Sequence, residues 1–215
     1  GPVKRPRDAG AAARRDQMSQ GLEAQRRKML VQYLLHLPAA DEDLLATLKR
    51  RAASRRRDPV YLWEALISAL STLGNARGYD GLVTNRGNFE RVSFEVLDSI
   101  DPRRRERHIE AVLRDAKVRM PVVKSVWLSR IFAFVKELGG PREATALARR
   151  QRGSEAKRLF MRQFLGIGEK YARDTWMDSH DPDFRDCIAL DVRVLKVSAL
   201  LGFAEADYAA HERLY

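Results

Sequence analysis

The stretch FLGIGEKYARDTW (Phe164–Trp176) joins two helix-like runs through a Gly-Ile-Gly turn and places Lys170 two residues after the second glycine. Glycine takes up positive φ without strain and has no Cβ atom, so the backbone at Gly166 and Gly168 can approach another molecule closely. The unpaired N–H groups at the start of the next helix add hydrogen-bond donors. The turn therefore predicts a helical hairpin that binds a phosphate at Leu165, Gly166, Gly168 and Lys170, although the same motif also occurs as a plain packing corner.

Helical spacing of apolar residues continues along most of the chain. Segment 58–74 carries Leu62, Leu66, Ala69 and Leu70 at this spacing and predicts a helix central to the core, with Asp58 as its cap. A short buried helix is expected over 29–37. Further helices are expected over 41–57, 92–100, 102–118, 122–138, 141–152, 154–163 and 192–201. The glycine-rich segment 74–88 is expected to be a loop. Because no alternating strand pattern is found, the predicted fold is all-α.

The chain of 215 residues has a formal net charge of +11, which favours a polyanion such as nucleic acid as partner. Residues 1–57 contain 14 Lys/Arg and 6 Asp/Glu, so most of the excess lies there. Runs such as KRRAASRRR (Lys49–Arg57) fit either a phosphate-seeking arm or a solubilising leader.

The lone cysteine, Cys187, excludes an internal disulfide and any metal or iron-sulfur site that needs four thiolates from this chain. The histidines have no metal-ligand spacing with Cys187 or with one another. No apolar run approaches the ~20 residues of a membrane span. We therefore expect no metal, no cofactor and no membrane association. The expected protein is a monomer located in the cytoplasm, or associated with the nucleoid if it is prokaryotic.

The hairpin and two other segments resemble a known family. F-L-G-I-G-E-K-Y-A, followed by I-A-L-D-V-R-V, resembles the helix-hairpin-helix DNA glycosylases, whose pattern is L-P-G-[VI]-G-x-K-x-A and then [VI]-D-[TV]-[HR]-[VI]. D-P-V-Y-L-W-E-A-L-I-S-A-L-S-T is similar to the early buried helix of the endonuclease III branch. The resemblance covers about Asp58 to Gly202, and leucine at position 165 replaces the usual proline. The four cysteines of the iron-sulfur branch are missing.

The resemblance implies a two-lobed arrangement of the helices. Residues 1–28 would form a basic arm or an exposed helix, and residues 29–75 would contribute to the second lobe and supply the early buried helix. Residues 76–202 would form the helix-hairpin-helix domain, with the hairpin at 164–170. Residues 203–215 would be a C-terminal tail that returns to the second lobe.

Two catalytic residues are implied by the resemblance. Lys170 matches the amine that attacks the anomeric carbon of the sugar, and a place in the first turn of a helix favours the uncharged form that attack requires. The alternative is an exposed lysine on a polar helix face. Asp191 matches the aspartate that stabilises positive charge on the sugar. The alternative is an N-cap for the helix from Val192, and the two roles are compatible.

Base flipping leaves a gap in the duplex that a side chain must fill. The family's glutamine position holds Leu70 here, and Asn75 or Arg77 are candidates to replace it. Other candidates could support the site. Trp176 would stack on the extruded base or belong to the core, while Arg173 and Arg193 would contact phosphate, tune Lys170 or form ordinary salt bridges.

The predicted function is therefore a base-excision DNA glycosylase with AP-lyase activity, which removes an oxidised or otherwise modified base from double-stranded DNA. Two alternatives remain open. One is a transferase that modifies DNA bases on the same fold. The other is a DNA-binding protein without catalysis, in which the hairpin only grips phosphate.

Overall fold

Helices account for nearly all of the regular structure in the computed structural model of this chain, which describes residues 21, 24–29, 31–32, 42–72, 77–200, 208 and 212. These described residues contain no strand, so the all-α prediction is confirmed. The chain divides into two units. The terminal unit comprises Gly1–Leu45 and Leu190–Tyr215, and the central unit comprises Ala46–Ala189. None of the described helices combines the length and the apolar character needed to cross a membrane.

Outside segment 74–91, most of the described helices begin and end within a few residues of their predicted bounds. They are α2 (Glu42–Arg57), α3 (Tyr61–Thr72), α4 (Arg77–Tyr79), the π-helical turn η1 (Asp80–Thr84), α5 (Arg86–Arg91), α6 (Phe94–Ser99), α7 (Pro102–Asp115), α8 (Pro121–Glu137), α9 (Pro141–Arg150), α10 (Gly153–Met161), α11 (Glu169–Met177), the 3-10 turn η2 (Pro182–Phe184) and α12 (Val192–Leu200). Side-chain caps explain several of the starts. Asp101 accepts a hydrogen bond from the backbone N–H of Arg103 at 2.8 Å, and Pro102 opens α7.

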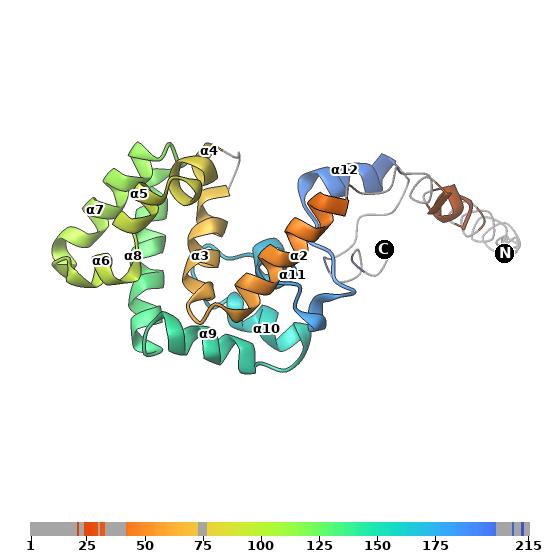
Figure 1. Cartoon of the computed structure of the whole chain (residues 1–215). Helices are drawn as coiled ribbons and strands as arrows, with labels where there is room; N and C mark the ends of the chain where they lie inside the picture. Colours follow the sequence, from red (N-terminus) through yellow and green to blue (C-terminus); the bar gives the residue numbers. More distant parts are fainter. Residues whose placement is uncertain are drawn as a thin grey trace, which may run out of the picture. The chain divides into compact units, whose positions relative to one another are not determined.

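Helix α3 is the centre of the central unit. It packs against α4, α8, α9 and α11, which Figure 1 shows on its different sides. The predicted apolar stripe of α3 is buried, with Leu62, Leu66 and Leu70 each exposed by 3% or less. Nine of its twelve residues are buried. The prediction of a helix central to the core is therefore confirmed for α3.

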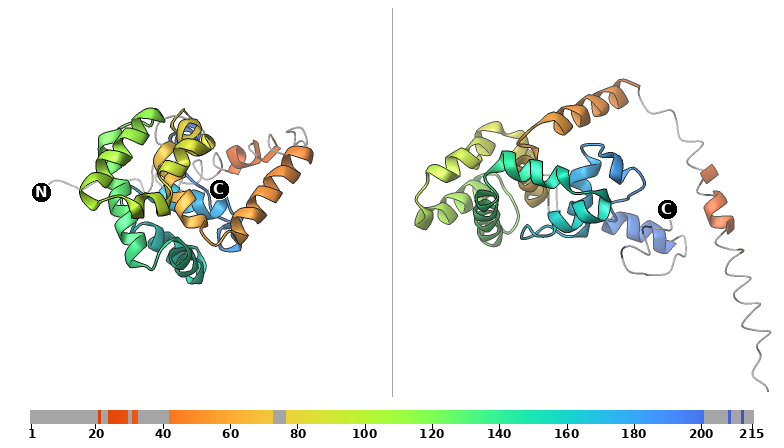
Figure 2. Two further views of the ribbon diagram at one scale, coloured as in Figure 1. Left: turned by 60° about the vertical axis from the view of Figure 1, so that its left-hand side comes forward. Right: turned by 90° about the horizontal axis from the view of Figure 1, so that it is seen from below.

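Helices α7 and α8 form a packed pair within the central unit, and α7 also contacts η1. The two helices pack along each other, and Figure 2 shows them, in green, side by side from two further directions. The buried core includes apolar residues from both helices, namely Ile109, Val112 and Leu113 of α7 and Leu128 and Ile131 of α8. Apolar burial of this kind is the main stabilising contribution.

The prediction of a loop over 74–88 is wrong for its described part. Residues 77–84 and 86–91 are helical, and Leu82 and Val83 are buried. The glycines serve close packing instead of turns. A Cβ atom on Gly81 would lie 2.1 Å from the carbonyl oxygen of Ala116, and one on Gly78 would lie 2.5 Å from that of Ser71. The glycine-rich composition of this segment predicted a flexible loop, but in the structure it allows two backbone segments to pack in direct contact.

The prediction of a buried helix over 29–37 is also wrong where the structure describes it. Residues 24–29 and 31–32 are helical, but Met29 is 65% exposed and Val31 is 53% exposed. Apolar content indicates a preference for burial and does not by itself place a segment inside a core.

Candidate functional site

The glycine turn between α10 and α11 is built around two buried apolar anchors. Phe164 is 1% exposed and Ile167 is 6% exposed, while Leu165 between them is 40% exposed. Gly166 has φ of +85°, a conformation that L side chains rarely adopt. A Cβ atom at this position would lie 2.5 Å from Cε3 of Trp127 on α8. The turn therefore requires glycine at 166 for both its conformation and its packing.

Gly168 has a different role. It precedes the first residue of α11 and caps that helix without a side-chain hydrogen bond. A Cβ atom added here would meet nothing within 4 Å beyond its chain neighbours. The first-turn N–H groups of a helix have no partner within the helix, so this open start is able to accept an anion.

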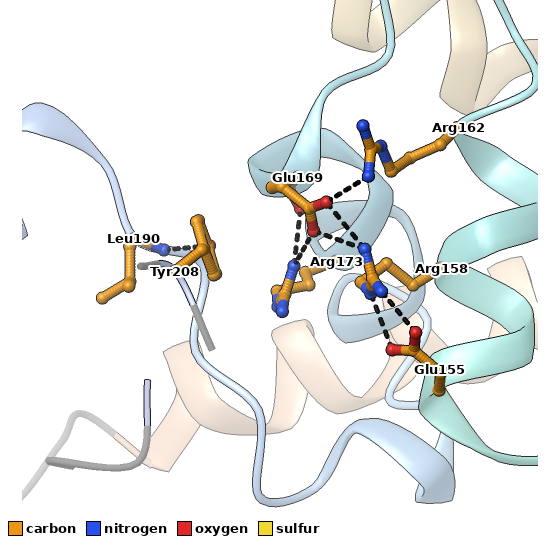
Figure 3. A network of polar contacts seen from close by, with 7 residues as sticks. All are labelled: Glu155, Arg158, Arg162, Glu169, Arg173, Leu190 and Tyr208. Carbon is orange, nitrogen blue, oxygen red and sulfur yellow. Dashed lines mark hydrogen bonds and ion pairs between the residues drawn. The ribbon is translucent and has the colours of Figure 1, made fainter. Parts of the chain in front are cut away.

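The first turn of α11 is held to α10 by a cluster of arginines around one carboxylate. The Glu169 carboxylate forms ion pairs with Arg158, Arg162 and Arg173, each with a closest N···O distance of 2.7 Å. Figure 3 shows the three guanidinium groups around the Glu169 carboxylate. Burial alone would raise the pKa of Glu169, but hydrogen bonds and charge from Arg173 and Arg158 outweigh it and hold that pKa below its ordinary value. Because Glu169 directly precedes Lys170, this cluster fixes where the lysine side chain starts.

Lys170 is the second residue of α11, and its side chain is 35% exposed. Its Nζ atom lies 2.6 Å from Oδ2 of Asp174, one helical turn later, and 4.6 Å from the centre of the Tyr171 ring. An amine attacks a carbon only when it is uncharged. The Asp174 carboxylate is in direct hydrogen-bonding contact with the lysine Nζ atom, and this ion pair must open before the nitrogen lone pair is available for attack.

Lys170 lines a cavity of about 290 Å³ within the central unit. The walls come from α3 and α11, with Arg55 of α2 and Tyr79 of α4 at the sides. The Tyr61 hydroxyl donates to the backbone carbonyl of Thr175 at 2.6 Å, which ties the two walls together. Burial raises the pKa of Tyr61, so this hydroxyl stays protonated. A cavity of this size beside an amine is large enough to receive a small flat ligand.

The sequence did not draw attention to the α3 wall. The three residues of α3 that are not buried are Glu64, Ser68 and Thr72, and all three line the cavity. They are spaced by four, so they follow one another along a single face of the helix. A polar stripe at this spacing within an otherwise apolar helix is the signal that identifies them.

Asp191 belongs to the terminal unit, where it starts α12. Its Oδ1 atom accepts hydrogen bonds from the backbone N–H groups of Arg193 at 2.8 Å and Val194 at 2.9 Å. The capping role is therefore confirmed. Just before it, the N–H of Leu190 donates to the Tyr208 hydroxyl at 2.5 Å. Since Lys170 lies in the central unit, the expectation that Asp191 shares its cleft stays a prediction.

The supporting candidates divide between core and surface. Leu70 is 3% exposed and Trp176 is 2% exposed, and Trp176 stacks on Phe184 with ring centres 6.2 Å apart. Both are core side chains here, so neither is presented to a duplex gap or a flipped base. Arg77 and Arg193 are exposed. Asn75 lies outside the described residues.

Arg173 is 5% exposed and pairs with Glu169. Its closest ion pair therefore lies within α11, and differs from the salt bridges to Asp174 or Asp191 that the sequence indicated as alternatives. The buried position makes Arg173 a structural residue of the cluster.

Part of the basic run at the end of α2 is engaged by the protein itself. Arg56 donates to the carbonyl oxygens of Ser179 at 3.3 Å and His180 at 2.9 Å, and Arg55 donates to that of Asp178 at 3.4 Å. These carbonyls follow the C-terminal end of α11, where positive charge is favourable. Arg55 and Arg56 therefore dock α2 on α11.

Comparisons of this chain with protein-family models, with curated proteins and with solved structures find no match.

Proposed function

We propose that this protein is a helix-hairpin-helix DNA glycosylase with AP-lyase activity, and that Lys170 is its nucleophile. The observation that carries the proposal is the cavity that Lys170 lines, where a carboxylate contacts the lysine amine at 2.6 Å. A nucleophile needs room for the reacting sugar, and the cavity offers that room beside Lys170.

The proposed reaction begins when the ion pair with Asp174 opens and the Lys170 ammonium loses a proton to solvent. The free amine attacks the anomeric carbon of the extruded nucleotide, and the bond to the base breaks with its electron pair leaving on the base, which takes up a proton. Loss of a proton from nitrogen and opening of the sugar ring give a Schiff base. Removal of a proton from the adjacent sugar carbon then expels the 3′ phosphate by β-elimination. In this proposal Asp191 stabilises the positive charge that develops on the sugar.

The glycine turn would bind the DNA backbone. Gly168 supports this role because the space where its Cβ atom would lie is open, and the start of α11 offers N–H donors with the positive end of a helix dipole. A Gly168→Ala variant is expected to keep its fold and to bind duplex DNA more weakly, because the added methyl group occupies the space that a phosphate would approach.

Reductive trapping tests the proposed nucleophile. The full chain is incubated with a duplex that contains one abasic site in the presence of borohydride, which reduces a Schiff base to a stable covalent adduct. The wild-type protein is expected to give an adduct that Lys170→Ala abolishes. Lys136→Ala is the matched control, since Lys136 is also a helix lysine paired with an aspartate, Asp98, and does not line the cavity. Trapping by Lys170→Ala, or no adduct with the wild-type protein, would overturn the proposal.

One observation favours a second candidate, a DNA-binding protein without catalysis. Lys170 and Asp174 have the i, i+4 spacing and the partial exposure of an ordinary helix-surface ion pair. In this case the protein would bind duplex DNA through the turn, release no base from damaged oligonucleotides, and bind equally well with Asp191→Asn. Under the glycosylase proposal, Asp191→Asn slows base release instead.

A further inference from the structure

The cavity beside Lys170 has two polar walls that face each other. One wall is the stripe of Glu64, Ser68 and Thr72 on α3, and the other is Lys170 and Asp174 on α11. Ala65 and Ala69 of α3 also line the cavity, and their small side chains leave room for a ligand. Tyrosine rings also line the space, which suits a flat aromatic ligand.

The charges of the two walls are paired differently. Asp174 on α11 is in contact with Lys170 at 2.6 Å, and Asp178, directly after α11, lies 3.6 Å from Arg55, so each of these carboxylates has a cation that also lines the cavity. Glu64 instead pairs at 3.7 Å with Arg86, and Arg86 is not among the residues that line the cavity. The ion-pair partner of Glu64 therefore stands outside the cavity lining, and at 3.7 Å it is beyond hydrogen-bond length, so the Glu64 oxygens can accept hydrogen bonds from a ligand in the cavity.

A carboxylate is an acceptor only, and it binds best to two adjacent N–H groups. The Watson–Crick edge of guanine carries two such donors, on the ring nitrogen and on the exocyclic amino group. The edge of thymine or uracil carries a single N–H between two carbonyl oxygens, and an oxygen facing the carboxylate would be repelled. A site that leaves a polar group unpaired against the wrong ligand discriminates against that ligand.

We propose that Glu64 is a specificity-determining residue that selects a base with adjacent N–H donors and rejects bases of the uracil and thymine type. This inference rests on the proposed function, because it assumes that the cavity beside Lys170 receives the extruded base. The side chain of Glu64 is 36% exposed. Water therefore competes for its oxygens, and we expect a preference of roughly tenfold, below that of a fully buried hydrogen-bonded charge.

The first test measures selection without any chemistry. Binding of deoxyguanosine and of thymidine to the full chain is compared by titration, and the ratio of their affinities is determined for the wild-type protein, Glu64→Gln and Glu95→Gln. Glu95 is an exposed glutamate on α6 that does not line the cavity. Glu64→Gln is expected to lower the ratio about tenfold, since an amide offers one acceptor and one donor in place of two acceptors. Glu95→Gln is expected to leave the ratio unchanged.

The second test separates this inference from the proposed function. Rates of base release are measured for duplexes that carry either a guanine-type lesion or a uracil-type lesion, alongside borohydride trapping at an abasic site, which contains no base to select. Trapping together with a lesion preference that Glu64→Gln does not change would overturn the Glu64 inference and leave the glycosylase proposal standing. Absence of trapping would overturn the glycosylase proposal, and the nucleoside titration then decides by itself whether Glu64 selects. Equal binding of both nucleosides by the wild-type protein would overturn the inference.

Discussion

Replacement of Lys124 by methionine is expected to stabilise this protein. Lys124 is the fourth residue of α8, and its side chain is completely buried on the same face as Leu128 and Ile131. Within the described part of the chain its Nζ atom has no hydrogen-bond partner. Burial, with a smaller effect from the nearby charge of Arg119, lowers the pKa of Lys124 from 10.5 to about 8.

This pKa gives the size and the pH dependence of the effect. At about 1.4 kcal/mol for each pKa unit, keeping the buried amine charged costs roughly 3 kcal/mol of folding free energy. Below about pH 8 the amine is charged in both the folded and the unfolded chain, so the full cost is present at pH 7. Between about pH 8 and 10.5 the unfolded chain binds the extra proton, so the stability contributed by this group rises with pH.

Urea unfolding of the wild-type protein and of Lys124→Met at pH 7, 8, 9 and 10 measures this directly. The variant is expected to be more stable by roughly 3 kcal/mol at pH 7, because methionine fills a similar volume without a charge, and by less than about 1 kcal/mol at pH 10. Lys136→Met, at an exposed position of the same helix, is the control and should change stability little. A Lys124→Met protein that is less stable at pH 7, or a difference that does not change with pH, would refute the reasoning.

Three further predictions concern the hairpin and its supports. Gly166→Ala should lower the free energy of unfolding by about 2–4 kcal/mol, because it combines positive φ with a clash against Trp127, whereas Gly168→Ala should change it by less than about 0.5 kcal/mol; denaturant unfolding of both compares them. Glu169→Gln should destabilise by roughly 1–3 kcal/mol at pH 7 and by progressively less as the pH falls below 4.5, the ordinary pKa of a glutamate, because the stabilisation from the lowered pKa is lost as the folded carboxylate is protonated; a difference independent of pH would contradict this. Arg56→Ala should lower the melting temperature while Arg57→Ala, at the neighbouring exposed position, should not, because Arg56, unlike Arg57, donates to the carbonyls after α11; equal effects would exclude this docking role.

The positions of helices could be predicted because their signals are local. Asp101 with Pro102 marks the start of α7, and Gly139, Gly140 and Pro141 mark the end of α8 and the start of α9. These signals depend on a few neighbouring residues, so the sequence alone contains them. The glycine turn was predicted for the same reason, because Gly166 satisfies a backbone conformation that its own segment imposes.

Errors arose where a residue's role depends on a distant segment. Gly81 indicates flexibility in sequence, but its role is to let η1 touch Ala116, which follows α7. Arg56 reads as part of a basic arm, but it binds carbonyl oxygens that lie more than 120 residues later. Such roles are properties of tertiary contacts, so composition and spacing cannot specify them.

In the candidate site, helix α3 shows both a local signal that the sequence contains and a role that depends on a distant segment. In α3, Leu62, Leu66 and Leu70 lie two positions from Glu64, Ser68 and Thr72, which is about half a turn of helix, so the apolar and polar stripes face opposite ways. The apolar stripe fixes α3 in the core, and this fixes where the polar stripe stands opposite Lys170 and Asp174. A core substitution such as Leu66→Ala, which leaves every polar group of the cavity in place, would therefore be expected to alter ligand selection as well as stability, because it loosens the wall that carries Glu64. The hydrophobic pattern that identifies α3 as a core helix therefore also fixes the position of its polar stripe. This stripe forms a site because α11 supplies Lys170 and Asp174 to the same cavity.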